Sequence, residues 1–376
     1  MVKYYSTERW KAITDGLKKK ILRSADPECV CYLDLAGLKT VKVVYGDPEA
    51  YKLISREFAW VLTDPVEDPD ATVFLWREPD VRSFGENLFG SELKYPGEDC
   101  YSLIKVTDLS LEGHPAWPAG QVNLDSRTIH FSDGDTYYYG TESFEPGKWI
   151  AEGHLFVQIL FRIMNGMPSA KLVHGACVGV DGNGILICAR GQKGKSTLAV
   201  TSMLDGFDFV SEDYLLLERE KDSLFASPLY SIMTLSPFMY DKLYDSLGRA
   251  RFMGVGPFKG KYLFDISDFR DQVKWHYPIK ACVFPEITPD ATEPRVEPCG
   301  PMEKNRAITH IAHSTLFQMW SHGFKQKQAD QDFMLSIIGM LNGLDFYKII
   351  LTPDIFANAE CLRSFVGTLS HSSCLS

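Results

Sequence analysis

A short loop near the middle of the chain carries the residues best suited to binding phosphate. It is the run Cys188-Ala189-Arg190-Gly191-Gln192-Lys193-Gly194-Lys195-Ser196-Thr197. An apolar, strand-like segment (184–188) precedes it, and a helix-like segment (196–204) follows. Strand, glycine-containing loop ending in Gly-Lys-Ser, and helix are the context that a phosphate-binding loop requires. In such a loop, backbone N–H groups and the positive end of the helix dipole point at phosphate oxygens.

The end of this loop predicts a nucleotide site. The Lys195 ammonium can reach the β- and γ-phosphates, and the Ser196 hydroxyl can bind Mg²⁺. The motif is imperfect, because Ala189 stands where the usual pattern has glycine and Lys193 adds a further cation. The alternative is therefore a basic turn in a protein that binds no nucleotide. The predicted nucleotide-binding residues are Gly191, Gln192, Lys193, Gly194, Lys195, Ser196 and Thr197.

Two adjacent carboxylates follow the next apolar segment. Residues 207–210 read as a short strand, which ends at Ser211-Glu212-Asp213. Nucleotide-binding loops need a carboxylate at a neighbouring strand end to complete the Mg²⁺ shell. A solvated acidic turn is the alternative, but the position of the pair, one helix beyond the loop, favours the metal-binding interpretation.

The elements that must position these groups can be read from the pattern of the chain. Residues 172–180 read as one strand, and Asp181-Gly182-Asn183-Gly184 as a tight hairpin turn that returns to the strand before the loop. Further strands are expected at 214–217, 263–266, 279–284 and 347–351, with a helix at 331–341.

The first part of the chain is rich in strand patterns and has no assignable motif. A helix is expected at 7–22, and a second, at about 150–165, bridges to the later part. We expect an α/β (α+β) chain with a β-rich domain over 1–149 and a second domain over 150–376. The role of the first domain is unassigned, with recognition of a substrate or partner as the suggestion. The expected strands are 30–35, 40–45, 71–76, 101–106, 128–131 and 136–139.

His174, the Gly194-Lys195-Ser196 loop and Glu212-Asp213 together resemble the catalytic domain of HPr kinase/phosphorylase-like proteins. That group is related in fold to ATP-dependent phosphoenolpyruvate carboxykinase. His174 precedes Lys195 by 21 positions (195 − 174), and Glu212 follows it by 17 (212 − 195). Both spacings match the family pattern, and the close resemblance covers residues 171–220.

The resemblance implies a mixed-sheet P-loop domain that binds ATP and Mg²⁺ and transfers the γ-phosphoryl group to a hydroxyl. Ser196 and Asp213 would hold Mg²⁺. Glu212 would be the general base on the acceptor, where the family has Asp. His174 would lie beside that carboxylate and the γ-phosphate, so the predicted catalytic residues are Glu212, His174 and Asp213.

The chain differs from true HPr kinase/phosphorylases in the sequence associated with the phosphate acceptor. After Glu212-Asp213 there is no Glu-x-Arg-Gly-x-Gly-Ile-Ile stretch, which is associated with the HPr partner and the phosphorylase reaction. HPr is therefore not favoured as the acceptor, and a peptide, a protein or a small molecule stays open. The alternatives to a kinase are a non-catalytic nucleotide-sensing module and a carboxykinase-like small-molecule enzyme.

Two further segments carry groups that could act or could be structural. Arg249, Arg251, Lys259 and Lys261 lie in a glycine-rich stretch that either closes over the phosphates or is a solvated basic loop. Trp275-His276-Tyr277 is interpreted as a core edge rather than a base-stacking platform.

Composition narrows the classes of partner. The 376 residues carry a formal net charge of −10, which argues against general binding to nucleic acid or anionic membranes. The 9 cysteines show no CxxC or zinc spacing, and no signal-peptide pattern opens the chain, so a cytoplasmic location is expected. The resemblance also implies that a homo-oligomer is possible.

Overall fold

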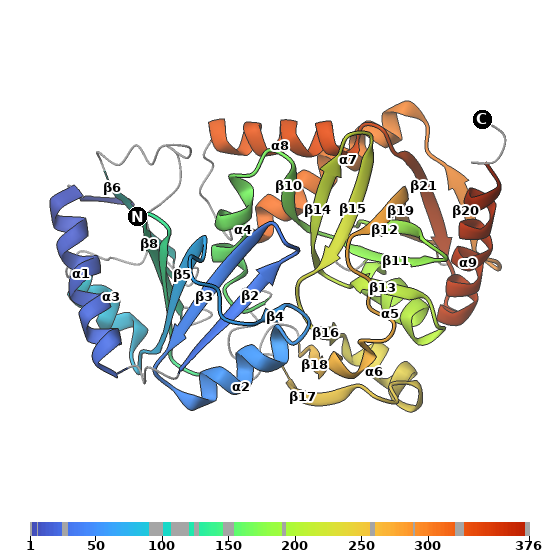
Figure 1. Ribbon diagram of the computed structural model, residues 1–376. Helices are drawn as coiled ribbons and strands as arrows, with labels where there is room; N and C mark the ends of the chain where they lie inside the picture. The colour runs from blue at the N-terminus through green and yellow to red at the C-terminus, as the bar shows by residue number, and fades with distance from the viewer. Residues whose placement is uncertain are drawn as a thin grey trace. The chain divides into compact units, whose positions relative to one another are not determined.

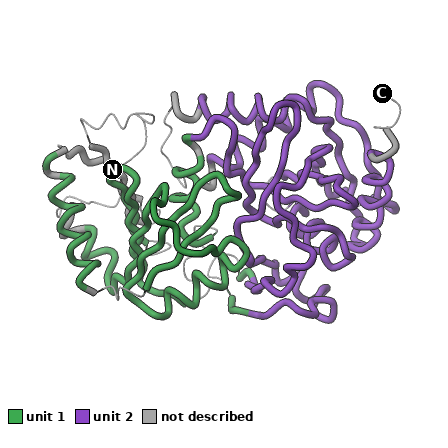
Figure 2. The backbone as a smooth tube through the Cα atoms, viewed as in Figure 1, with its two compact units in different colours: residues 1–166, 253–261, 319–330 green, residues 167–252, 262–318, 331–376 purple. Residues whose placement is uncertain are grey.

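The computed structural model describes residues 2–5, 7–24, 29–89, 101–106, 120–123, 128–145, 154–189, 193–255, 260–288, 290–319 and 327–372. The chain divides into two compact units (Figure 2). Unit 1 comprises residues 1–166, 253–261 and 319–330, and unit 2 comprises residues 167–252, 262–318 and 331–376. The domain roles and the boundary at 149/150 stay predictions.

Unit 1 is built on a nine-stranded mixed sheet in the order β1-β6-β7-β8-β9-β5-β3-β2-β4. Its strands are β1 (Val2–Tyr5), β2 (Val30–Leu35), β3 (Lys39–Tyr45), β4 (Leu62–Thr63), β5 (Ala71–Arg77), β6 (Tyr101–Val106), β7 (Gly120–Asn123), β8 (Thr128–Asp133) and β9 (Thr136–Thr141). Its helices are α1 (Thr7–Ser24), α2 (Pro48–Glu57), α3 (Val81–Phe89) and α4 (Val157–Asn165). The strands expected from the sequence are confirmed to within two residues at their ends.

Helices cover both faces of the sheet of unit 1. Successive side chains of a strand point to opposite faces, so neighbouring residues contact different helices. Tyr138 of β9 stacks on Phe131 at 4.8 Å, within the cluster that also contains Trp10 of α1. The next residue, Tyr139, instead contacts the ring of Phe156, which lies just before α4. Buried aromatic pairs of this kind hold helices against both faces.

The elements from residue 170 onward position the candidate site. The strands are β10 (Ala170–His174), β11 (Ala176–Val180), β12 (Asn183–Ile187), β13 (Asp208–Ser211), β14 (Tyr214–Glu220), β15 (Ser223–Pro228), β16 (Ile232–Leu235), β17 (Arg251–Val255), β18 (Tyr262–Asp265), β19 (Tyr277–Ile287), β20 (Arg295–Pro298) and β21 (Asp345–Leu351). The helices are α5 (Lys195–Leu204), α6 (Pro237–Leu243), α7 (Pro301–Met319), α8 (Lys327–Leu341) and α9 (Ile355–Ser372), with 3₁₀ turns η2 (Tyr244–Ser246) and η3 (Ser267–Phe269).

The large sheet of unit 2 is mixed, so the expected α/β (α+β) class is confirmed. Its order is β10-β14-β15-β19-β12-β11-β13, and β21 pairs with β19 and β20. The strands β12, β19 and β21 run parallel to one another, and the remaining pairs are antiparallel. Helices α5 and α9 contact each other and β11 (Figure 1).

The hairpin before the loop forms as predicted. The strands β11 and β12 pair antiparallel from Ala176↔Ile187 to Val180↔Asn183. Asp181 and Gly182 have φ values of 50° and 78°, the left-handed conformation that a two-residue hairpin turn requires.

The single strand expected over 172–180 is instead two strands, broken at Gly175. The first, β10, pairs with β14, and the second, β11, pairs with β12 and β13. At the break, the Gly175 N–H donates to the carbonyl of Asp213 at 2.8 Å rather than to a sheet partner. The bridging helix is shorter than expected, because α4 begins at Val157. Among the described residues, no helix is long and apolar enough to cross a membrane.

Candidate active site

The loop joins the end of β12 to the first turn of α5. Gly194 precedes this helix with φ 92°, a conformation that residues with a side chain rarely adopt. A Cβ at Gly194 would stand 2.6 Å from Cδ1 of Leu351, the last residue of β21. Glycine is therefore required here for both backbone conformation and space. The predictions for Gly191 and Gln192 lie outside the described residues.

Three of the predicted nucleotide-binding residues reach solvent at this end of the helix. Lys193 is exposed, and Ser196 and Thr197 are half-buried in the first turn of α5. The first N–H groups of a helix have no acceptor within the helix, and the helix dipole favours anions there. The chain thus forms the strand and the helix that the motif predicts on either side of the loop.

Lys195, at the first position of α5, has a charged side chain that is nearly buried. Its side chain is 8% exposed, and its ammonium donates to the Asp213 carboxylate at 2.8 Å. It also donates to the backbone carbonyl of Glu212 at 2.7 Å. A buried ammonium is unfavourable unless it is paired and hydrogen-bonded, and both conditions are met here.

Asp213 reaches Lys195 because two short connections between strands lie next to each other. The first connection, at Gly175, joins β10 to β11, and the second, at Glu212 and Asp213, joins β13 to β14. Ser211 stabilises the second connection, since its hydroxyl accepts from the Asp213 N–H at 3.3 Å and donates to the Tyr214 carbonyl at 2.6 Å. Both connections lie beside the end of β12, where the loop begins.

His174 contacts Asp213, whereas the sequence led us to expect Glu212 as its neighbour. Its Nε2 lies 2.9 Å from the same Asp213 oxygen that accepts from Lys195. Its backbone N–H donates to the hydroxyl of Thr315, a residue of α7, at 3.0 Å. The difference arises because Glu212 and Asp213 direct their carboxylates to different partners.

The Glu212 carboxylate is turned toward β16. Its Oε1 accepts from the Thr234 backbone N–H at 2.8 Å and from the Thr234 hydroxyl at 3.2 Å. The residue is 2% exposed, and its Oε2 is buried with no hydrogen-bond partner among the described residues. A buried acceptor without a donor is unfavourable, so this oxygen is suited to receive a proton or a hydroxyl from a ligand.

Tyr214, next to the acidic pair, closes the inner side of the site. Its ring lies 5.4 Å from the imidazole of His174 and is fully buried. Burial, and then the nearby carboxylates of Asp213 and Glu212, raise the pKa of the Tyr214 phenol well above its ordinary value. The phenol therefore stays protonated and adds no charge to the cluster.

The basic stretch is engaged with other aspartates. Arg249 pairs with Asp271 at 2.8 Å, and Arg251 pairs with Asp265 at 3.3 Å. Both guanidinium groups are about half exposed, with side-chain exposures of 45% and 60%. The Arg249 contact is that of a solvated surface loop, whereas Arg251 begins β17 and pairs with the buried Asp265, and Lys259 lies outside the described residues.

Sequence reasoning missed the two threonines that hold the site together. Thr234 and Thr315 are buried and donate to or accept from site residues that lie 22 and 141 positions away along the chain. Neither residue stands in a motif, so no local signal in the sequence marks them.

Comparisons with known proteins find matches among solved structures. No protein-family model and no curated protein sequence matches the chain. Among solved structures, the chain is similar to the Hpr(Ser) kinase/phosphatase from Coxiella burnetii, with 13% identity and a TM-score of 0.26. That match covers 55% of this chain and 97% of the other. Because the score is low, the fold class and the site rest on the sheets and contacts described above.

Proposed function

We propose that this protein is an ATP- and Mg²⁺-dependent kinase that transfers the γ-phosphoryl group to a hydroxyl of a peptide, a protein or a small molecule. One observation carries the proposal: the Asp213 carboxylate joins Lys195, at the start of a helix that follows a glycine loop, to His174. Three titratable groups held together with little exposure are more typical of a functional site than of a surface ion pair.

The start of α5 suits a nucleoside triphosphate. The N–H groups of its first turn and the Lys195 ammonium offer donors and positive charge to the β- and γ-phosphates. The donor set also fits Mg²⁺, which prefers oxygen ligands, because the cluster offers the Asp213 carboxylate and the first turn of α5 carries the Ser196 hydroxyl. Ser196 and Asp213 would hold the ion, which when bound neutralises charge on the transferring phosphoryl group.

Glu212 is suited to act as the general base. In the transfer step, the acceptor hydroxyl gives its proton to Oε2 while its oxygen bonds to the γ-phosphorus and the bond to the β-phosphate oxygen breaks, which releases ADP. Thr234 holds the other oxygen and so fixes the direction of Oε2. His174 is a positioning residue in this scheme, because it acts on the Asp213 carboxylate and not on the acceptor.

Label transfer from γ-labelled ATP tests the proposal. The full chain is incubated with Mg²⁺, labelled ATP and panels of hydroxyl-bearing acceptors, and both phosphorylated product and ADP are measured. Lys195→Ala is expected to lose nucleotide binding. Glu212→Gln is expected to keep nucleotide binding and lose transfer by roughly 10²–10⁴-fold, the usual contribution of a general base.

Matched variants separate these effects from general damage. Lys280→Ala removes an exposed lysine of β19, and Glu360→Gln an exposed carboxylate of α9, and both should leave turnover unchanged. Folded wild-type protein that neither turns over ATP nor transfers label would overturn the kinase assignment. Nucleotide binding without any turnover would instead establish the nucleotide-sensing alternative.

A further inference from the structure

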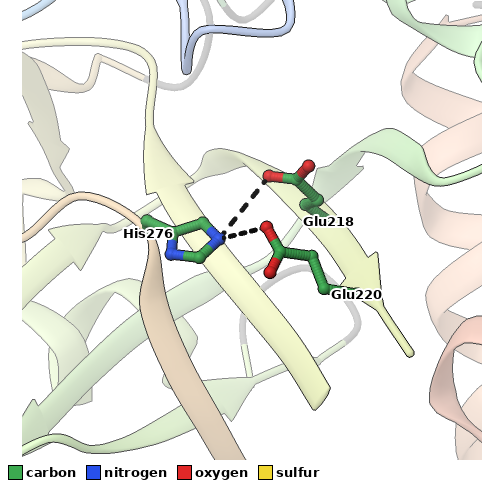
Figure 3. A group of neighbouring side chains, drawn as sticks. All are labelled: Glu218, Glu220 and His276. Atoms are coloured by element: carbon green, nitrogen blue, oxygen red, sulfur yellow. Dashed lines mark hydrogen bonds and ion pairs between the residues drawn. The ribbon is translucent and has the colours of Figure 1, made fainter. Parts of the chain in front are cut away.

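A second cluster of potential ligands lies on β14 and directly before β19. Glu218, Glu220 and His276 each offer one ligand atom, and these atoms lie within 4.8 Å of one another (Figure 3). The Nε2 of His276 is 2.8 Å from a Glu220 oxygen and 3.9 Å from a Glu218 oxygen. None of these three residues belongs to the candidate active site.

The sheet register builds this cluster. Glu218 and Glu220 are two positions apart on β14, so their side chains share one face of the sheet. The strand β15 runs between β14 and β19, and Phe225 of β15 pairs with Glu218 on one side and Pro278 on the other. His276, two residues before Pro278, therefore reaches across β15 to the two carboxylates.

The imidazole of His276 is held in place from two directions. Its ring stacks on the Phe225 ring with 3.9 Å between centroids and 8° between planes. Its backbone has φ 47°, a conformation that is unfavourable for most side chains, and its N–H donates to the Ser227 hydroxyl at 3.0 Å. These contacts aim Nε2 at the carboxylates, as Figure 3 shows.

The charges of the cluster are unbalanced. Among the described residues, each carboxylate forms an ion pair with His276 alone. Two carboxylates that repel each other beside an imidazole nitrogen would be stabilised by a bound cation.

We propose that Glu218, Glu220 and His276 bind a divalent first-row transition metal ion, such as Zn²⁺ or Co²⁺. One neutral imidazole and two carboxylates balance a charge of +2, and the nitrogen favours these ions over Mg²⁺ or Ca²⁺. Two atoms that bind the same ion at about 2.0–2.2 Å can lie at most about 4.4 Å apart. The distances from the His276 Nε2 to the Glu218 and Glu220 oxygens are both shorter than this limit. Three protein ligands leave further positions open to water.

This metal site is distinct from the Mg²⁺ site of the proposed kinase. Glu218 and Glu220 follow Tyr214 by four and six positions along β14. At about 3.3 Å per residue, they stand roughly 13–20 Å along the strand from Tyr214, which directly follows the acidic pair. The ion would tie β14 and β19 together across β15, away from the loop.

Titration with Co²⁺ tests this site directly. The full chain is freed of metal with a chelator, and Co²⁺ is added while visible absorption is recorded. Wild type should bind one ion with a visible band typical of nitrogen and oxygen ligands and without the near-ultraviolet band of thiolate ligands. His276→Asn, which tolerates positive φ, and Glu218→Gln should weaken binding by more than the roughly 10- to 100-fold that loss of an outer-shell partner costs.

The controls make the outcome decisive. His313→Asn, at an exposed histidine of α7, and Ser196→Ala, at a predicted Mg²⁺ ligand, should bind Co²⁺ like wild type. Circular dichroism and urea unfolding in chelator check that each variant is folded, and Glu220→Gln replaces any that is not. Equal binding by wild type and His276→Asn would overturn the site, as would loss of binding only in Ser196→Ala. Neither outcome bears on ATP turnover, so the kinase proposal is tested separately.

Discussion

Thr234 donates two hydrogen bonds to one oxygen of Glu212, from its backbone N–H at 2.8 Å and from its hydroxyl at 3.2 Å. Both residues are buried, and the second Glu212 oxygen has no hydrogen-bond partner among the described residues. The threonine therefore holds the carboxylate through one oxygen, and the other is the oxygen to which we assign the role of base. A residue of β16, outside every motif, thus sets the geometry of the proposed base.

Thr234→Val should lower kcat without changing nucleotide affinity. Valine has the same shape and keeps the backbone donor, but it removes the hydroxyl that holds Glu212. A hydrogen bond to a charged group contributes about 1.5–3 kcal/mol, so kcat should fall roughly 10-fold or more. Thr234→Ser retains the hydroxyl and should restore most of the rate. Steady-state kinetics measure this, and a loss confined to KM would contradict the positioning role.

Lys195 and Asp213 should show a large coupling energy in a double-mutant cycle. Their side chains are 8% and 16% exposed, so removing one partner leaves the other poorly solvated. The double variant Lys195→Met/Asp213→Asn should be less destabilised than the sum of its single variants by about 0.5–3 kcal/mol. Urea unfolding gives the values.

An exposed ion pair supplies the comparison for this cycle. Arg249 and Asp271 are 45% and 65% exposed, and the corresponding cycle should yield roughly 0.2–1 kcal/mol or less because solvent screens the pair. Equal coupling in the two cycles would mean that burial of Lys195 and Asp213 has no energetic effect.

The local parts of this site could be predicted from the sequence because their signals are local. The turn at Asp181 and Gly182 needs residues that adopt positive φ, and the sequence supplies them next to two apolar runs. The helix after Gly194 follows from its composition and from the Gly-Lys-Ser motif. Confirmed elements of this kind place Lys195 at a helix start.

The long-range parts could not be predicted. The break at Gly175 depends on a hydrogen bond to Asp213, 38 positions later (213 − 175), and no pattern within residues 172–180 reveals it. Asp213, rather than Glu212, is the neighbour of His174 because of the directions in which the two-residue connection between β13 and β14 points these carboxylates. Helix α7, which supplies Thr315, escaped prediction as well, although Pro301 at its start is a common helix signal.

Gly194→Ala should destabilise the protein and impair nucleotide binding. Alanine at φ 92° is strained by about 1–2 kcal/mol, and its Cβ would also meet Leu351 at 2.6 Å. Gly339→Ala is the matched control, because a Cβ at this position of α8 would meet nothing within 4 Å. That change should leave nucleotide binding intact and stabilise the protein by about 0.5–1 kcal/mol. Urea unfolding and nucleotide titration of both variants decide the matter; a Gly194→Ala protein as stable as wild type would show that the loop tolerates a side chain.

Glu57, on α2 of unit 1, should make stability fall as pH rises. Burial raises the pKa of its carboxyl well above the ordinary value of 4.5, although the Leu155 N–H donates to it at 3.1 Å and lowers it in part. Above pH 4.5 the unfolded chain has therefore released this proton while the folded chain still holds it. Since the folded state binds more protons in that window, the free energy of unfolding decreases with increasing pH, by up to about 1.4 kcal/mol per pH unit.

Glu57→Gln should remove this pH dependence, because the amide has the size of the protonated carboxyl and does not titrate. The variant should be more stable than wild type at pH 8, with a smaller difference at pH 5. Glu67→Gln, at an exposed carboxylate of the same unit, is the control and should follow wild type at both values. Urea unfolding across this range measures the slopes. A Glu57→Gln slope equal to that of wild type would mean that Glu57 is ionised in the folded state, in conflict with its full burial.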